Sequence, residues 1–183
     1  MYNFNRVIPR IGTNSAKYDS IRELYGVSPE SGLGMGIADM DFEPPEEVIE
    51  ALKQELNQGV FGYYGNQKNY DKALKQWLLD QHLWEIDVDW ISVTHGLVQA
   101  IGIALRAFSN PNDSVIVFSP VYHSFKKIIK ANNRTILEYE MEQVQGQYTF
   151  DLDKLEMMLT GKEKILIFCS PHNPGGRVWT IKE

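Results

Sequence analysis

The sequence has a single cysteine, Cys169, among its 183 residues, so no disulfide bond can form within the chain. Acidic residues outnumber basic ones and give a formal net charge of -6, which argues against a nucleic-acid partner or an anionic membrane surface. No apolar run reaches membrane-spanning length, and the start of the sequence lacks the apolar segment of a signal peptide. We therefore expect a cytoplasmic protein with no nucleic-acid partner and no membrane partner.

Several common binding and catalytic motifs are also missing. The sequence contains no Gly-x-Gly-x-x-Gly fingerprint, no Gly-x-x-x-x-Gly-Lys phosphate loop and no Gly-x-Ser-x-Gly nucleophile turn. The histidines are scattered, and no group of His, Cys and Asp residues has the spacing of metal ligands. These absences argue against a dinucleotide site of the usual kind, a P-loop, an α/β-hydrolase triad and a metal centre.

Short apolar runs alternate with helical patterns through most of the chain. Strands are expected at residues 90–93, 114–118, 134–139 and 164–168, and helices at 97–108, 121–131 and 152–159, besides two that begin near residues 46 and 66. Strands that alternate with helices predict βαβ units. The expected fold class is therefore α/β, with a mostly parallel sheet, helices on both faces and an irregular N-terminal arm before it.

The stretch from Ile165 to Trp179 holds the densest group of candidate site residues. It opens as an apolar run, expected to be a strand buried on both faces with Cys169 inside it, and then breaks into a loop rich in proline and glycine. Asn173 offers a fixed amide there, and Arg177 is either an anion contact or a structural ion-pair partner. Ligands of open α/β sheets bind just past the carboxyl ends of the strands.

Two further loops follow expected strands. Thr94 to Val98 forms a strand-to-helix turn, where Gly96 permits a close backbone approach and the helix N-terminus offers free N–H groups to an anion such as phosphate. Tyr122 begins the next helix and either lies flat on an aromatic ligand or packs on the core. An anion seat, a flat aromatic ring and an amide at one sheet edge together suggest a planar phosphorylated ligand.

Four motifs resemble one known family. In chain order they are residues 38–42 (Ala-Asp-Met-Asp-Phe), 61–63 (Phe-Gly-Tyr), 120–122 (Pro-Val-Tyr) and 171–180 (Pro-His-Asn-Pro-Gly-Gly-Arg-Val-Trp-Thr). They resemble the pyridoxal-phosphate-dependent C–S lyases of the MalY/PatB type, cystathionine β-lyase-like members of the fold type I aminotransferase superfamily. The resemblance extends from about residue 36 to the last residue, and the final motif is the most specific.

The resemblance implies roles for residues around the cofactor, pyridoxal 5'-phosphate. The backbone amides of Gly96, Leu97 and Val98 would hold its phosphate. Tyr122 would stack on its pyridine ring, and Asn173 would form a hydrogen bond to its ring hydroxyl oxygen. A cis peptide is expected between Asn173 and Pro174, as in related folds.

The resemblance also implies a dimer and a substrate. Tyr63 would reach the cofactor phosphate of the neighbouring subunit of a homodimer, and Ala38 would lie beside a small amino-acid substrate. The implied reaction is the β-elimination of cystathionine or a related cysteine S-conjugate to a thiol, pyruvate and ammonia. An aminotransferase shares all of these residues and is the alternative, together with a non-catalytic regulatory or binding relative.

The Schiff-base lysine of the family is expected beyond Glu183, because no lysine here has the family's sequence context. No catalytic residue is therefore expected within the chain, which should be inactive or nearly so alone. The resemblance divides the chain into an arm, residues 1–45, and the N-terminal part of the cofactor-binding large domain, residues 46–183. The rest of the large domain and the small domain are expected to be absent.

Overall fold

The computed structural model describes residues 3–183 and falls into two compact units, Met1–Gln67 and Lys68–Glu183. The first unit holds two helices, α1 (Ile21–Tyr25) and α2 (Glu46–Gln58). The second holds the remaining elements, which are α3 (Lys68–His82), the 3₁₀ turn η1 (Val88–Trp90), α4 (Leu97–Phe108), β1 (Ser114–Ser119), α5 (His123–Ala131), β2 (Thr135–Glu140), β3 (Glu142–Val144), β4 (Gln147–Thr149), α6 (Leu152–Met158) and β5 (Glu163–Ile167). The division after residue 45 stays a prediction.

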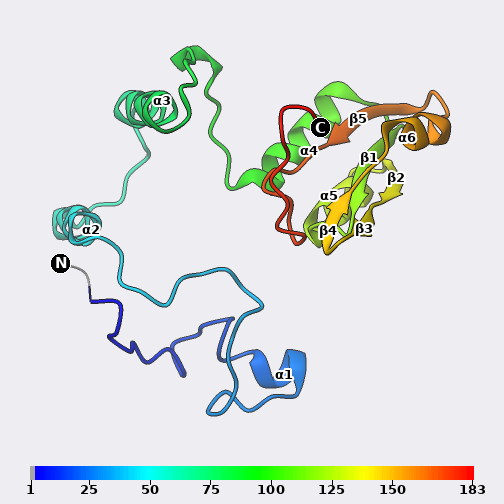
Figure 1. Cartoon of the computed structure of the whole chain (residues 1–183). Helices are drawn as coiled ribbons and strands as arrows, with labels where there is room; N and C mark the ends of the chain where they lie inside the picture. Colours follow the sequence, from blue (N-terminus) through cyan, green and yellow to red (C-terminus); the bar gives the residue numbers. More distant parts are fainter. Residues whose placement is uncertain (1–2) are drawn as a thin grey trace. The chain divides into compact units, whose positions relative to one another are not determined.

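The second unit is built on a three-stranded parallel sheet in the order β2-β1-β5 (Figure 1). Ser114 pairs with Thr135 of β2, and Val115 pairs with Ile165 of β5, so β1 is the central strand. The connection from β1 through α5 to β2 is a βαβ unit, as the alternating pattern predicts. A separate antiparallel hairpin joins β3 to β4 through a turn at Gln145 and Gly146, both with positive φ.

Side chains of β1 alternate between two cores, because successive residues of a strand face opposite sides. Val115 and Val117 pack with Leu105 of α4 and Ile129 of α5 on one face. Ile116 and Phe118 pack on the other face in a cluster that also contains Tyr139, Met141 and Leu155 of α6. The α/β fold with helices on both faces of a parallel sheet is therefore confirmed.

Helix ends follow their local sequence. Asp151 caps α6 by accepting hydrogen bonds from the N–H groups of Asp153 and Lys154. Gly59 ends α2 in the left-handed conformation. At the C-terminus of α4, the buried guanidinium of Arg134 donates to the carbonyl oxygen of Leu105 at 3.1 Å and to Ser109 Oγ at 2.9 Å.

Two sequence-based expectations were wrong. Residues 90–93 do not form a strand: η1 ends at Trp90, and no described strand pairs with the three residues after it. A strand needs a hydrogen-bonded neighbour, which local propensity does not supply. The second error concerns β5, whose residues alternate between half-buried and exposed rather than being buried on both faces, since among residues 3–183 it has β1 as its single neighbour. Cys169 is half-exposed and lies two residues past the end of β5, not inside the strand.

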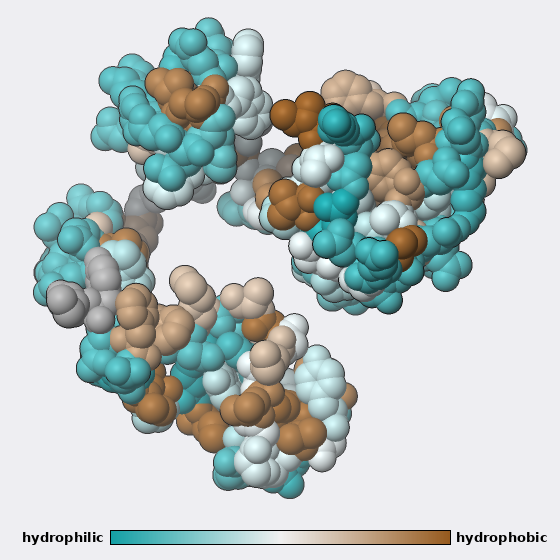
Figure 2. All heavy atoms as spheres, in the orientation of Figure 1, coloured by the Kyte–Doolittle hydropathy of each residue, from teal (hydrophilic) through white to brown (hydrophobic). Residues whose placement is uncertain are grey.

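Large apolar side chains remain exposed in both units, and Figure 2 shows hydrophobic residues at the surface. On α2 they form a stripe of Val48, Leu52 and Leu56, each about half-exposed. No helix within residues 3–183 is both long and apolar enough to cross a membrane.

Leu105→Ala tests the core on the α4 face of the sheet. Leu105 is 1% exposed, so we expect a loss of about 2–5 kcal/mol in unfolding free energy, from lost burial and from the cavity left behind. The matched control is Ile103→Ala on the same helix, where the side chain is 45% exposed and a change of about 0.5 kcal/mol is expected. Denaturant unfolding measures both, and equal losses would contradict this packing.

Candidate functional site

The carboxyl ends of β1 and β5 define the edge of the sheet where the candidate residues gather. The two strands are parallel neighbours, so both end at the same edge. The segment after β1 carries Tyr122, and the segment after β5 carries Asn173. Two of the predicted site residues are thus brought to one edge by the strand pairing itself.

The loop after β5 has a compact backbone. The N–H of His172 donates to the carbonyl oxygen of Arg177 at 2.7 Å, and the N–H of Gly176 donates to that of His172 at 2.6 Å. The Asn173–Pro174 peptide is cis, which confirms the prediction, and the Ser119–Pro120 and Ser170–Pro171 peptides are cis as well.

His172 joins this loop to the segment after β1. Its ring is 3% exposed, and Nε2 lies 2.7 Å from the carbonyl oxygen of Pro120. The sequence places His172 in the most specific motif but does not indicate this contact, because its partner is 52 residues away.

Tyr122 and Asn173 differ in how firmly they are held. The Tyr122 ring is half-buried and makes edge contacts with the rings of His123 and Phe125, at 4.9 and 5.5 Å between centroids. Asn173 is exposed, and its side-chain amide has no hydrogen-bond partner among residues 3–183. The amide is therefore available to a ligand.

The N-terminus of α4, the predicted anion seat, has no capping side chain. Gly96 precedes the helix with φ of 89°, a conformation that favours glycine. The N–H groups of Leu97 and Val98 have no acceptor within the described chain, whereas the N–H of Gly96 donates to the carbonyl oxygen of Thr94 at 2.8 Å. Two of the three predicted phosphate donors are thus free.

This anion seat belongs to the same sheet edge. The helix α4 packs along the sheet through Leu105, and a five-residue connection, 109–113, leads from its C-terminus to the start of β1. The C-terminus of α4 therefore lies near the beginning of β1, and its N-terminus lies toward the carboxyl end of the strand. The seat reaches this edge although no strand forms before it.

Arg177 is a structural residue. Its Nε donates to the carbonyl oxygen of Tyr148 at 3.1 Å, its Nη1 donates to that of Val178 at 2.8 Å, and its Nη2 forms an ion pair with Glu183. The guanidinium also lies 5.0 Å from the centre of the Trp179 ring. Sequence analysis left two roles open for Arg177, and these contacts show the structural ion-pair partner.

The remaining two candidates, Ala38 and Tyr63, belong to the first unit. Ala38 lines a hollow of about 480 Å³ that is also lined by Lys17, Met35 and Met40. Tyr63 is fully exposed in the irregular segment between α2 and α3.

Charged side chains in the first unit form a hydrogen-bonded network that the sequence pattern did not predict. Asp39 and Asp41 of the Ala-Asp-Met-Asp-Phe motif both accept hydrogen bonds from Arg10, the Asp41 contact measuring 2.6 Å. Asp41 also accepts from Lys17 Nζ at 2.7 Å and from the Tyr18 hydroxyl at 3.0 Å. The donation from Lys17, followed by that from Arg10, lowers the pKa of Asp41 from 3.8 to about 2.

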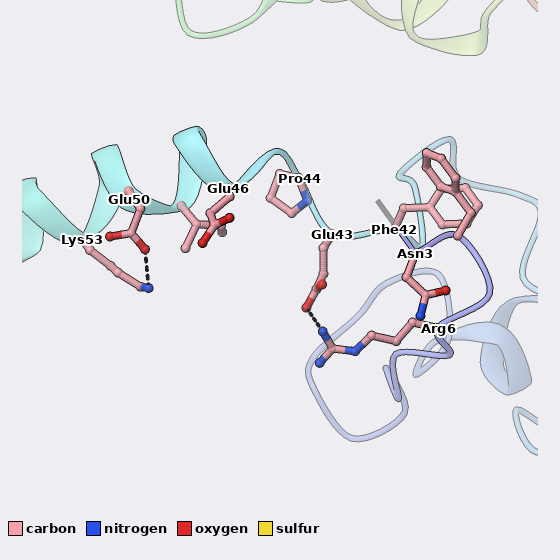
Figure 3. A pocket seen from close by; sticks show the side chains of 10 residues that line it. Asn3, Arg6, Phe42, Glu43, Pro44, Glu46, Glu50 and Lys53 are labelled. Atoms are coloured by element: carbon pink, nitrogen blue, oxygen red, sulfur yellow. Dashed lines mark hydrogen bonds and ion pairs between the residues drawn. The ribbon is translucent and has the colours of Figure 1, made fainter. Parts of the chain in front are cut away.

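A larger pocket, of about 560 Å³, lies between the start of the chain and α2 (Figure 3). Four of its charged side chains form ion pairs: Arg6 lies 2.5 Å from Glu43, and Lys53 lies 2.7 Å from Glu50. No group of His, Cys, Asp and Glu within residues 3–183 is placed to hold a metal ion. None of its lining residues is one that the family resemblance assigns to the cofactor or the substrate, so its size does not make it the candidate site.

Comparison with known proteins places the chain in a family. Residues 30–183 match the family model of aminotransferase class I and II, and the chain belongs to that family. It is 38% identical over 182 residues to cystathionine beta-lyase PatB of Bacillus subtilis (strain 168), covering 99% of this chain and 46% of that protein. Protein MalY of Escherichia coli (strain K12) is 34% identical, with 100% of this chain and 47% of that protein covered.

A solved structure agrees with these relatives. The structure of cystalysin from Treponema denticola, which contains a pyridoxal 5'-phosphate cofactor, has a TM-score of 0.90 and 42% identity, covering 100% of this chain and 47% of that one. The resemblance to the MalY/PatB type, inferred from four motifs, is therefore confirmed. The chain spans about half the length of the relatives that it matches.

The charge network predicts a pH dependence. Because the pKa of folded Asp41 is lowered, its ion pairs stabilise the first unit above about pH 4, and this stabilisation is lost as the pH falls toward 2. Carboxyl ¹³C chemical shifts measure the titration directly. Lys17→Met should raise the pKa of Asp41, whereas Lys53→Met, which removes an ion pair with Glu50, should not. An Asp41 pKa near 3.8 in the unsubstituted protein would refute the network.

Proposed function

We propose that this chain forms part of a pyridoxal-phosphate-dependent C–S β-lyase that cleaves cystathionine or a related cysteine S-conjugate to a thiol, pyruvate and ammonia. The observation that carries the proposal is that the uncapped N-terminus of α4, the Tyr122 segment and the Asn173 loop all lie toward one edge of the sheet. The match to lyases over the whole chain supports the choice of reaction.

The residues at the edge fit the cofactor. The free N–H groups of Leu97 and Val98, at the positive end of the α4 dipole, would hold the phosphate. Gly96 would shape this turn, but its own N–H is already engaged with Thr94. The half-exposed ring of Tyr122 would cover the pyridine ring, and the free amide of Asn173 would donate to the ring hydroxyl oxygen. When bound, pyridoxal phosphate supplies an electron sink for the α-carbon of the amino acid.

The rest of the proposal concerns the assembly. We propose a homodimer in which the exposed Tyr63 reaches the phosphate site of the neighbouring subunit, and a substrate that lies beside Ala38. We further propose that the Schiff-base lysine lies outside residues 1–183, which leaves the cofactor's phosphate and ring contacts within residues 46–183. A cytoplasmic location remains a prediction.

Aminotransferase activity is the second candidate, because the matching family model is named for aminotransferases. The same phosphate, ring and hydroxyl contacts serve both reactions. The two differ in what happens after the α-proton is removed: a lyase expels the thiol, whereas an aminotransferase moves the amino group to a keto acid.

The reaction is tested with the protein that carries this chain together with its remaining domains. Given cystathionine and no keto acid, it should release pyruvate and thiol in equal amounts. Matched reactions with an added keto acid should not be faster. Turnover that requires the keto acid would identify an aminotransferase and overturn the lyase proposal.

The position of the lysine is tested on residues 1–183 alone. We expect that borohydride treatment in the presence of pyridoxal phosphate leaves no single lysine labelled, as peptide mass spectrometry reports. Pyridoxal without the phosphate serves as the control for non-specific labelling. Stoichiometric labelling of one lysine that depends on the phosphate would place the catalytic lysine inside the chain.

A further inference from the structure

His172 is the one side chain that joins the two loops of the candidate site by a hydrogen bond among residues 3–183. Its Nε2 meets the carbonyl oxygen of Pro120, across 52 positions of sequence, at 2.7 Å. Pro120 precedes Tyr122 by two residues, and His172 immediately precedes Asn173. The contact therefore lies between the proposed ring-stacking residue and the proposed hydroxyl-binding residue.

The chemistry of this contact defines the state of the ring. A carbonyl oxygen can only accept a hydrogen bond, so Nε2 carries the proton. Nδ1 is buried and has no partner within the described chain. Pro120 is therefore the single hydrogen-bond partner of the imidazole ring within the described chain, and this bond joins the two backbone segments.

The surrounding packing leaves the ring little freedom. Its centre lies 6.0 Å from that of the Trp179 ring, in an edge-on arrangement. A Cβ atom built on Gly175 would clash with Tyr148 Cδ2 at 2.8 Å and would crowd His172 Cδ2 at 3.3 Å, so this segment packs closely beside the imidazole. The backbone hydrogen bonds at both His172 N–H and His172 carbonyl oxygen fix the base of the side chain as well.

We infer that His172 is a positioning residue, which sets the separation of Tyr122 and Asn173 through its hydrogen bond to Pro120. This inference rests on the proposed function, since it assigns Tyr122 and Asn173 to the cofactor ring. His172 itself does not touch the reacting atoms. Its effect reaches the cofactor through the two loops that it joins.

Two substitutions separate the hydrogen bond from the bulk of the ring. His172→Gln places an amide N–H near the position of Nε2 and should keep the bond, whereas His172→Phe keeps an aromatic ring and loses it. In the protein that carries this chain together with its remaining domains, we expect His172→Phe to weaken pyridoxal phosphate binding about tenfold, which corresponds to about 1.4 kcal/mol. The absorption spectrum of the bound cofactor should change as well. His172→Gln should stay within about threefold of the unsubstituted protein, a rescue by about 0.7 kcal/mol.

A second readout does not need the cofactor. The N–H of Gly176 donates within one loop and the N–H of Phe125 donates to Tyr122 next to the other. His172→Phe should accelerate the local hydrogen exchange of both amides together, and His172→Gln should restore both. Arg134→Met is the matched control, because it removes another buried polar tether that holds the end of α4, away from both loops. Arg134→Met should lower the melting temperature without accelerating hydrogen exchange at these two amides and without changing the cofactor spectrum.

The outcomes are distinct. If His172→Phe leaves exchange at Phe125 unchanged, or if His172→Gln fails to restore it, the positioning role is overturned. If the unsubstituted protein binds no pyridoxal phosphate, the proposed function fails, and the exchange measurements alone decide whether His172 joins the loops. If exchange responds as expected but binding and spectrum are identical in all variants, the loops are joined without effect on the cofactor, which also overturns the inference.

Discussion

The parallel pairing of β5 with β1 is the constraint on which the site depends. It sends two loops, separated by about 50 residues in sequence, to the same edge of one sheet. The pairing is supported from both faces by apolar side chains, since Val115 and Val117 face α4 and α5 while Ile116 and Phe118 face the cluster that includes α6. The hydrophobic cores thus place the polar residues, and His172 refines their position with one hydrogen bond.

The first unit is organised by a different force. It has few buried apolar residues. Its irregular backbone is held mainly by ion pairs to Asp39 and Asp41 and by hydrogen bonds that Asp19 accepts from backbone N–H groups. A single exposed ion pair contributes little to stability, so the first unit is stabilised by several charges that act together around this pair of aspartates. One of the four family motifs, Ala-Asp-Met-Asp-Phe, thus also supplies the two aspartates of this charge network.

The sequence predicted what depends on local pattern. Helix α4 has the predicted bounds, and β1 and β5 differ from theirs by about a residue. Helix propensity and end signals, such as the caps at Gly59 and Asp151, act over a few residues and can be read from local sequence. The expected strand at 90–93 failed because pairing is a property of distant neighbours. The expectation that Cys169 lies inside the strand also failed, since β5 ends two residues before it.

Polar contacts between distant segments could not be predicted from the sequence either. Nothing in the local pattern shows that Arg10 and Lys17 meet Asp41, or that His172 meets Pro120, since each contact joins segments more than 20 residues apart. Local pattern singled out the turn that carries Leu97 and Val98, together with Tyr122 and Asn173, and the family resemblance supplied their expected roles at the cofactor. The structure adds that the first two have free N–H groups and that the amide of Asn173 is unoccupied.

The central claim is that this sheet edge binds pyridoxal phosphate through these residues. A titration of ¹⁵N-labelled protein with pyridoxal phosphate tests it most directly, followed at the backbone amides of Leu97 and Val98 and at the side-chain amide of Asn173. The account predicts that all three signals shift together along one saturation curve, and that inorganic phosphate shifts the two backbone amides alone. Saturable binding that leaves Leu97, Val98 and Asn173 unperturbed would contradict it.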